Sequence, residues 1–126
     1  MKKIVITSLA VLLLLPLLGA AQNAPKATAD ISFSFHAGDK VLPAGLYDFK
    51  ADVAKSTIRV LNIKTNESIM VSVLTRISQR EGNETLVVFD QVKDQYYLSE
   101  IHMPGVDGFH LQGAPGPHNH VTIKAK

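Results

Sequence analysis

The chain has 126 residues, with 13 lysines and arginines, 11 aspartates and glutamates, and no cysteine. This length suits one ordinary domain, and the lack of cysteine excludes both a disulfide framework and a lipid attached to an N-terminal cysteine. Two of the basic residues, Lys2 and Lys3, precede residue 22, so eleven basic and eleven acidic residues remain after it. The remainder is neutral, and its sequence shows no basic stripe that would favour nucleic acid or an anionic membrane as a partner.

Residues 1–21 have the pattern of a secretory signal peptide. Lys2 and Lys3 make a positive start, residues 4–18 are almost wholly apolar, and small residues at 19–21 offer a cleavage site before Gln22. The apolar run is short for a membrane span, although an uncleaved anchor is the alternative. The sequence therefore predicts an exported protein, periplasmic or extracellular, with no stable membrane anchor after cleavage. Residues 22–28 are then expected to form a flexible leader.

From residue 29 onward, apolar and polar residues alternate as they do in a half-buried strand. The apolar positions of the first run are Ala29, Ile31, Phe33 and Phe35. A helix would place Phe33 and Phe35 on opposite sides, so the pattern predicts one strand over residues 29–36.

Two corners follow this strand. Gly38 and Asp39 supply turn residues, and Leu42-Pro43-Ala44-Gly45 forms the second corner. Pro43 lacks an N–H, so we expect it outside the central hydrogen-bond ladder. Gly45 is expected to take a positive φ as the chain leaves the corner. Gly38, Pro43 and Gly45 are therefore interpreted as structural turn residues.

The corner also lies within a longer motif. Residues Phe33 to Tyr47 read F-x-F-x-x-G-x-x-x-L-P-A-G-x-Y, which resembles the opening of a family of small secreted all-β proteins of unknown function from soil bacteria such as Acidobacteria. Residues 88–89 and 94–98 resemble that family's later strand pair, so the similarity spans about residues 31–105. The end of the chain, from Gln112, departs from it. The L-P-x-G-x-Y corner alone is similar to a turn of prealbumin-like sandwich modules. The resemblance implies a small exported β fold and brings no catalytic residue with it.

Further short runs suit strands at 46–51, 57–63, 69–77, 86–89, 96–102, 109–111 and 121–123. Residues 57–63 are apolar on both faces, which indicates a doubly buried strand or a bulge near Val60. Residues 69–77 alternate as one long strand, and residues 86–89 suit a central strand. Seven or eight strands without a helical period predict an all-β fold, either a small antiparallel β-sandwich (prealbumin-like or Ig-like) or a small barrel. The domain would span residues 29–126, with a mobile Gly/Pro/His-rich stretch at 112–120.

His118 and His120 form the most suggestive chemical pattern. Side chains two residues apart in an extended segment point the same way, so both imidazoles could bind one zinc or copper ion. His102 and His110 are candidates for a third and fourth ligand. The alternative is a solvated polar tail, because no acidic residue follows His120.

Catalytic patterns are missing from the sequence. The serines lack the G-x-S-x-G context of an activated nucleophile, and no Gly-rich phosphate loop is present. Tyr96 and Tyr97 are adjacent, so one must face outward and is a candidate surface contact. The sequence thus favours an exported, non-enzymatic binding or structural module without a cofactor, whose partner would be a protein or carbohydrate at the cell envelope and not nucleic acid. A metal-binding exported protein is the alternative.

Overall fold

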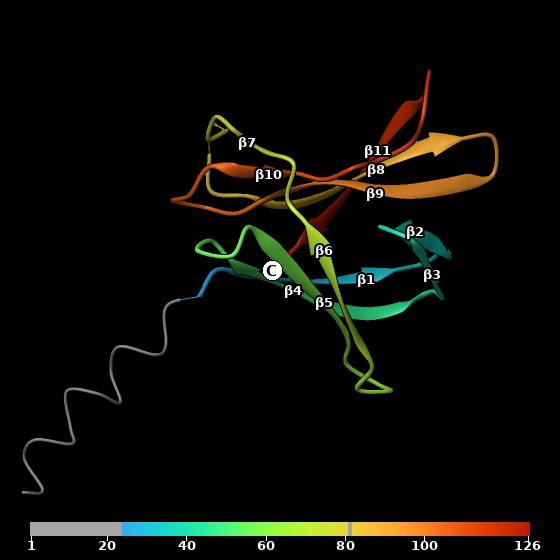
Figure 1. Ribbon diagram of the computed structural model, residues 1–126, viewed down its shortest axis with the longest axis horizontal. Helices are drawn as coiled ribbons and strands as arrows, with labels where there is room; N and C mark the ends of the chain where they lie inside the picture. The colour runs from blue at the N-terminus through green and yellow to red at the C-terminus, as the bar shows by residue number, and fades with distance from the viewer. Residues whose placement is uncertain (1–23, 81) are drawn as a thin grey trace, which may run out of the picture.

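The computed structural model describes residues 24–80 and 82–126. The predicted signal peptide and the first leader residues, Gln22 and Asn23, lie outside this part. The described residues are all-β, as predicted, and form two sheets packed face to face rather than a closed barrel (Figure 1). Within the same residues, no helix has the length and hydropathy to cross a membrane.

The lower layer in Figure 1, called sheet A, is regular and antiparallel throughout. Its strand order is β1-β4-β5-β6, and pairing continues without interruption along each neighbouring pair. The strands are β1 (Lys26–Ile31), β4 (Gly45–Asp52), β5 (Thr57–Asn62) and β6 (Ser68–Ser72).

The upper layer, called sheet B, has the order β11-β8-β9-β10-β7, and the short hairpin of β2 and β3 lies beside β9. One pairing is parallel, that of His36 with Tyr97, so the predicted antiparallel sandwich is mixed at this point. The strands are β2 (Phe35–Ala37), β3 (Lys40–Leu42), β7 (Thr75–Ile77), β8 (Thr85–Val92), β9 (Gln95–His102), β10 (Gly108–His110) and β11 (Asn119–Ala125).

The core lies between the two sheets and consists of the inward-facing alternate residues of both. Phe35 is at its centre, with its ring centroid 5.2 Å from that of Tyr47 in sheet A and 5.2 Å from that of Phe89 in sheet B. Both contacts are edge-to-face, the arrangement that aromatic quadrupoles favour. The two sheets also meet at one margin, where the backbone groups of Thr28 and Lys126 exchange two hydrogen bonds of 2.9 Å. The C-terminus is therefore held against sheet A.

Each of two runs predicted as a single strand forms two strands, one in sheet A and one in sheet B. The run 29–36 leaves sheet A after Ile31 and enters sheet B at Phe35, and the run 69–77 changes sheets between Ser72 and Thr75. Alternation continues through the first crossing, where Phe33 and Phe35 both pack against the core. It does not continue through the second, because Arg76 of β7 lies opposite the core residue Phe109 and over its ring, so that Thr75 and Ile77 face the outer side of sheet B. The prediction of seven or eight strands was therefore too low, since the described residues form eleven, including the short β3.

Three local predictions were wrong. Gly45 is absent from the positive-φ residues and is the first residue of β4, paired with Ile31. Residues 57–63 are neither buried on both faces nor bulged at Val60, because Ile63 is exposed and β5 keeps continuous register with β4. The leader was predicted to reach residue 28, yet β1 begins at Lys26, and Ala27 is fully buried.

Other local predictions were confirmed. Gly38 has a φ of 58° in the two-residue turn between β2 and β3, a backbone region that glycine enters at no steric cost. Pro43 lies between β3 and β4, outside both ladders. The central strand predicted at 86–89 is β8, which has β11 on one side and β9 on the other.

Residues 112–118, here called the crossing segment, connect β10 with β11 over the outer face of sheet B. Leu111, the residue before the segment, donates its N–H to Ser99 O of β9 at 2.7 Å. The segment then passes β8, where Ala114 N donates to Asp90 Oδ2 at 3.0 Å. The segment covers Asp90 and Ser99, which are buried on this face of the sheet. The mobility predicted for residues 112–120 stays a prediction. Sheet A has no such covering segment among the described residues.

Candidate metal site

Asp90 is the buried carboxylate at the centre of a polar cluster on the outer face of sheet B. It lies on β8, and its side chain is 5% exposed. One oxygen, Oδ2, accepts the hydrogen bond from Ala114 N. The other, Oδ1, is buried and accepts no hydrogen bond from the described residues. A buried carboxylate oxygen without a donor is costly, so this atom calls for a cation or a proton beside it.

His118, at the end of the crossing segment, lies against this oxygen. Its Nε2 is 3.2 Å from Asp90 Oδ1, and its Nδ1 is 2.9 Å from Gly116 O. A carbonyl oxygen can only accept, so Nδ1 must carry a proton in that contact. In the neutral ring, Nε2 then presents its lone pair toward the carboxylate. The same arrangement is common in metal sites, where a backbone carbonyl fixes the ring so that the other nitrogen binds the ion.

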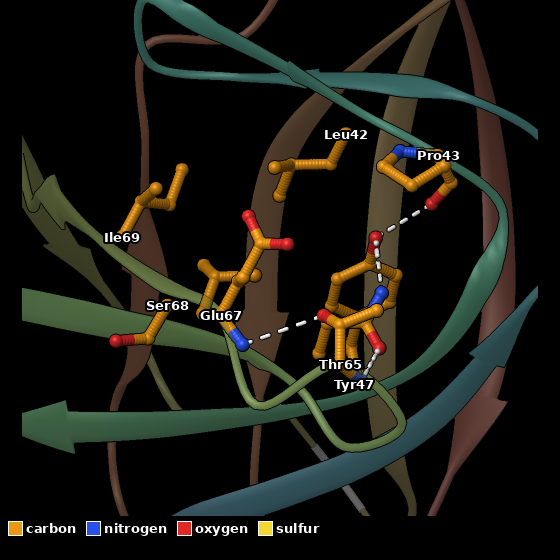
Figure 2. A pocket seen from close by; sticks show the side chains of 9 residues that line it. Leu42, Pro43, Tyr47, Thr65, Glu67, Ser68 and Ile69 are labelled. Atoms are coloured by element: carbon orange, nitrogen blue, oxygen red, sulfur yellow. Dashed lines mark hydrogen bonds between the residues drawn. The ribbon is translucent and has the colours of Figure 1, made fainter.

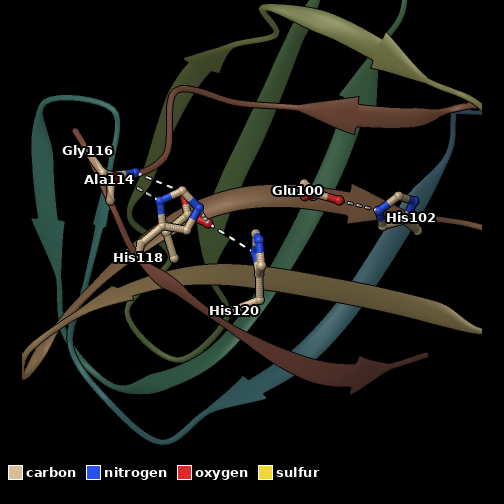
Figure 3. A network of polar contacts seen from close by, with 7 residues as sticks. Glu100, His102, Ala114, Gly116, His118 and His120 are labelled. Carbon is tan, nitrogen blue, oxygen red and sulfur yellow. Dashed lines mark hydrogen bonds and ion pairs between the residues drawn. The ribbon is translucent and has the colours of Figure 1, made fainter.

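His120 approaches from the neighbouring strand. It is directly opposite Asp90 in the pairing of β11 with β8, and its Nδ1 is 3.3 Å from Asp90 Oδ1. The rings of His118 and His120 are nearly perpendicular, with centroids 5.0 Å apart. Figure 3 shows the two imidazoles close together, that of His118 at the end of the crossing segment and that of His120 on β11.

Two of the three donor-atom separations in this cluster suit a small divalent ion. The three nearest donor atoms of Asp90, His118 and His120 all lie within 4.8 Å of one another. In a tetrahedral site with bonds of about 2.0–2.1 Å, neighbouring donor atoms are about 3.3–3.4 Å apart. The two measured carboxylate–imidazole separations, 3.2 and 3.3 Å, are close to that edge length. The side chains of His118 and His120 are 27% and 56% exposed, so an ion here would keep a side open to solvent.

The predicted third and fourth ligands are not part of this cluster. His102 is paired with Leu86 on β8, far along the strand from Asp90, and its Nε2 is 2.8 Å from Glu100 Oε1. Figure 3 shows this separate pair beyond the other two histidines. His110 is on β10, opposite Glu100. Neither histidine lies in the group formed with His118 and His120, whose third member is Asp90.

Asp90 is the residue that sequence reasoning missed. It comes 28 positions before His118, and no local motif joins the two. One signal was available, because Asp90 directly follows the apolar run 86–89 of the predicted central strand. An acidic residue in a central strand is buried at a cost unless it has a partner, so it was a candidate ligand in its own right.

The two adjacent tyrosines lie on opposite faces, as strand geometry requires. Tyr96 turns toward the core and stacks on Phe33, with ring centroids 3.9 Å apart. Tyr97 stacks on His36 at 4.3 Å, and His36 Nε2 is 2.9 Å from Gln95 Oε1. Tyr97 therefore remains the candidate for a surface contact, which stays a prediction.

A small hollow lies at the margin of the sandwich. Its volume is about 120 Å³, and Figure 2 shows Leu42, Tyr47, Glu67 and Ile69 around it. Tyr47 donates to Pro43 O at 2.6 Å and accepts from Asn62 Nδ2 at 3.3 Å. Burial raises the pKa of Tyr47 above its usual 10.0, the hydrogen bond from Asn62 opposes this, and the charge of Glu67 adds to it. The Tyr47 hydroxyl is therefore held by hydrogen bonds on both sides, between Pro43 and Asn62.

Comparison with known proteins adds no relative. No protein family, curated protein or solved structure matches this chain.

Proposed function

We propose that this chain is an exported, non-enzymatic binding protein whose ligand is a divalent transition-metal ion, Zn²⁺ or Cu²⁺, held by Asp90, His118 and His120. The observation that carries the proposal is the buried Oδ1 of Asp90, which faces two imidazole nitrogens at 3.2 and 3.3 Å without a hydrogen-bond donor. Imidazole and carboxylate are ligands that both ions accept. Export is supported by the sequence pattern of residues 1–21.

The cluster would hold the ion between elements that are far apart in sequence. Asp90 comes from β8, His118 from the end of the crossing segment, and His120 from the edge strand β11. A bound ion therefore ties the crossing segment and β11 to the centre of sheet B, and its binding free energy adds to the free energy of unfolding. Three protein ligands also leave a fourth position for water or a further ligand.

The test is calorimetric titration of the purified protein with ZnCl₂ and CuCl₂ at neutral pH. We expect one ion per chain, and at a free metal concentration of 100 times Kd the stabilisation would be about 2.7 kcal/mol, a rise in Tm of about 10 °C. The variants Asp90→Asn and His118→Ala/His120→Ala should lose both the binding heat and the rise in Tm.

His110→Ala is the matched control, because it removes one histidine outside the cluster and should leave binding unchanged. Equal binding by wild type and the double variant would refute the site. Loss of binding in His110→Ala would instead restore the ligand set predicted from the sequence. Turnover of ester, glycoside or peptide substrates by the metal-loaded protein would contradict the non-enzymatic part of the proposal.

A further inference from the structure

The outer face of sheet A contains a row of like charges across three strands. Lys26 of β1 is directly opposite Lys50 of β4, and Lys50 is directly opposite Arg59 of β5. Like charges at directly opposed positions of an antiparallel pair destabilise the sheet. A departure of this kind from a local stability rule occurs most often where a protein binds something.

The acidic residues nearby leave two of the three cations without a partner. Asp48 accepts a hydrogen bond from Thr28 Oγ1 at 2.6 Å and lies 3.8 Å from Lys26 Nζ. Asp52 Oδ1 accepts from Lys55 N at 3.1 Å in the turn after β4. Within the described residues, Lys50 and Arg59 form no ion pair.

Lys50 and Arg59 stand between two hollows of different character. The first, of about 180 Å³, is lined by the three cations of the row together with Asp48 and Leu61. The second, of about 540 Å³, is lined by Lys50, Arg59 and Asp52, and apolar groups of Pro25, Val53 and Met70 make up much of the rest of its wall. Val53 and Met70 are 51% and 58% exposed, so this apolar wall faces solvent.

We propose that this face binds a single-chain amphiphile with an anionic head group, a phosphate or carboxylate on an aliphatic chain. Lys50 and Arg59 contact the head group, since ammonium and guanidinium groups form their strongest hydrogen bonds with such oxygens. The aliphatic chain lies along Val53 and Met70, whose burial removes apolar surface from water. The charge of the ligand also relieves the repulsion within the row.

This site is independent of the metal site. It is on the other sheet, and none of its residues belongs to the cluster around Asp90. Failure of either proposal therefore leaves the other standing, and the binding experiment uses metal-free buffer.

The experiment is an NMR titration of the ¹⁵N-labelled protein with three probes below their micelle concentrations. Octyl phosphate supplies head and tail, inorganic phosphate the head alone, and octyl glucoside a neutral head with the same tail. We expect octyl phosphate to bind at least about tenfold more tightly than either other probe, with shifted amides at Lys50, Arg59 and Met70.

Variants test the two parts of the site separately. Lys50→Gln and Arg59→Gln should each weaken octyl phosphate about tenfold, and Met70→Ser should weaken it without changing the affinity for inorganic phosphate. Lys124→Gln, an exposed lysine on β11, is the charge-matched control and should change nothing. Without ligand, Lys50→Gln should raise Tm, because it removes the central charge of the row.

Several results would overturn the proposal. Equal affinity for octyl phosphate and octyl glucoside would show that the cations do not contribute. Equal affinity for octyl phosphate and inorganic phosphate would show that the apolar wall does not. Binding to phosphatidylglycerol vesicles but not to octyl phosphate would identify a membrane surface instead. A lower Tm in Lys50→Gln would show that the row is not strained.

Discussion

The two sheets use their outer faces in opposite ways. Sheet A pairs without interruption, and no segment within residues 24–80 and 82–126 covers its outer face, where cations and apolar side chains lie side by side. Sheet B has a register shift between Val88 and Phe89, and the crossing segment covers part of its outer face, so that Asp90 and Ser99 are buried there. A covered face can hold an enclosed polar site, whereas a bare face offers a broad surface. The candidate metal site is on the covered face of sheet B, and the candidate amphiphile site is on the outer face of sheet A.

The largest expected effect on stability comes from a change in the core that the two sheets share. Phe35 contacts Tyr47 of sheet A and Phe89 of sheet B, while the half-buried Phe33 contacts Phe89 and Tyr96, both of sheet B. Phe35→Ala should cost about 3–5 kcal/mol in the free energy of unfolding, measured with urea, because it leaves a cavity against both sheets. Phe33→Ala should cost less. Equal costs would mean that the contacts of Phe35 with both sheets contribute no more to stability than those of Phe33 with sheet B alone.

The sequence could predict the layers but not their boundaries. Alternation from Ala29 to Phe35 correctly assigned the inward positions. Alternation from Ile69 to Ile77 did so only as far as Val73, because in β7 it is Arg76 that shares a face with the core residue Phe109. It could not reveal that the chain changes sheets at Ser32–Ser34 and at Val73–Leu74, since a residue that points into a sandwich core looks the same from either sheet. Gly45 shows a similar limit, because a Pro-Ala-Gly corner can continue in ordinary extended backbone.

Both candidate sites depend on pairings that local patterns do not contain. His118 and His120 were recognisable because they are two residues apart, but Asp90 joins them only through the pairing of β8 with β11. Lys26, Lys50 and Arg59 are dispersed in the sequence and form no basic stripe there, yet strand register places them in one row. Cross-strand neighbours become visible only when register is known.

The next test asks whether the crossing segment covers sheet B as closely as the comparison requires. Gly113 has a φ of 65°, and a Cβ at this position would collide with Asp90 Oδ2. Gly113→Ala should therefore cost about 2–3 kcal/mol, from backbone strain and from displacement of the segment, and it should weaken metal binding.

Gly116→Ala is the matched control in the same segment. Gly116 has a φ of 83°, but a Cβ there would meet no atom within 4 Å, so backbone strain of about 1 kcal/mol is the expected cost. Thermal unfolding and zinc titration of both variants make the comparison. Similar losses in the two variants would mean that close contact with Asp90 is unimportant.

The smallest expected effect is a change in stability with pH that arises at the margin of sheet A, around Tyr47, and not on either outer face. Burial raises the pKa of Tyr47 above 10.0, whereas in the unfolded chain the hydroxyl titrates near about 10. Between these values the folded protein keeps a proton that the unfolded chain has lost, so this contribution to stability is complete below pH 10 and declines as the pH rises through the folded pKa.

Tyr47→Phe should cost about 1 kcal/mol at neutral pH, because Pro43 O and Asn62 Nδ2 lose their partner, and should flatten the decline above pH 10. Urea unfolding from pH 7 to 11 measures both effects, with Tyr97→Phe on the outer face of sheet B as the control that keeps the wild-type slope. An identical slope in Tyr47→Phe and wild type would mean that the alkaline loss of stability arises elsewhere in the protein, and that the margin of sheet A is not sensitive to pH.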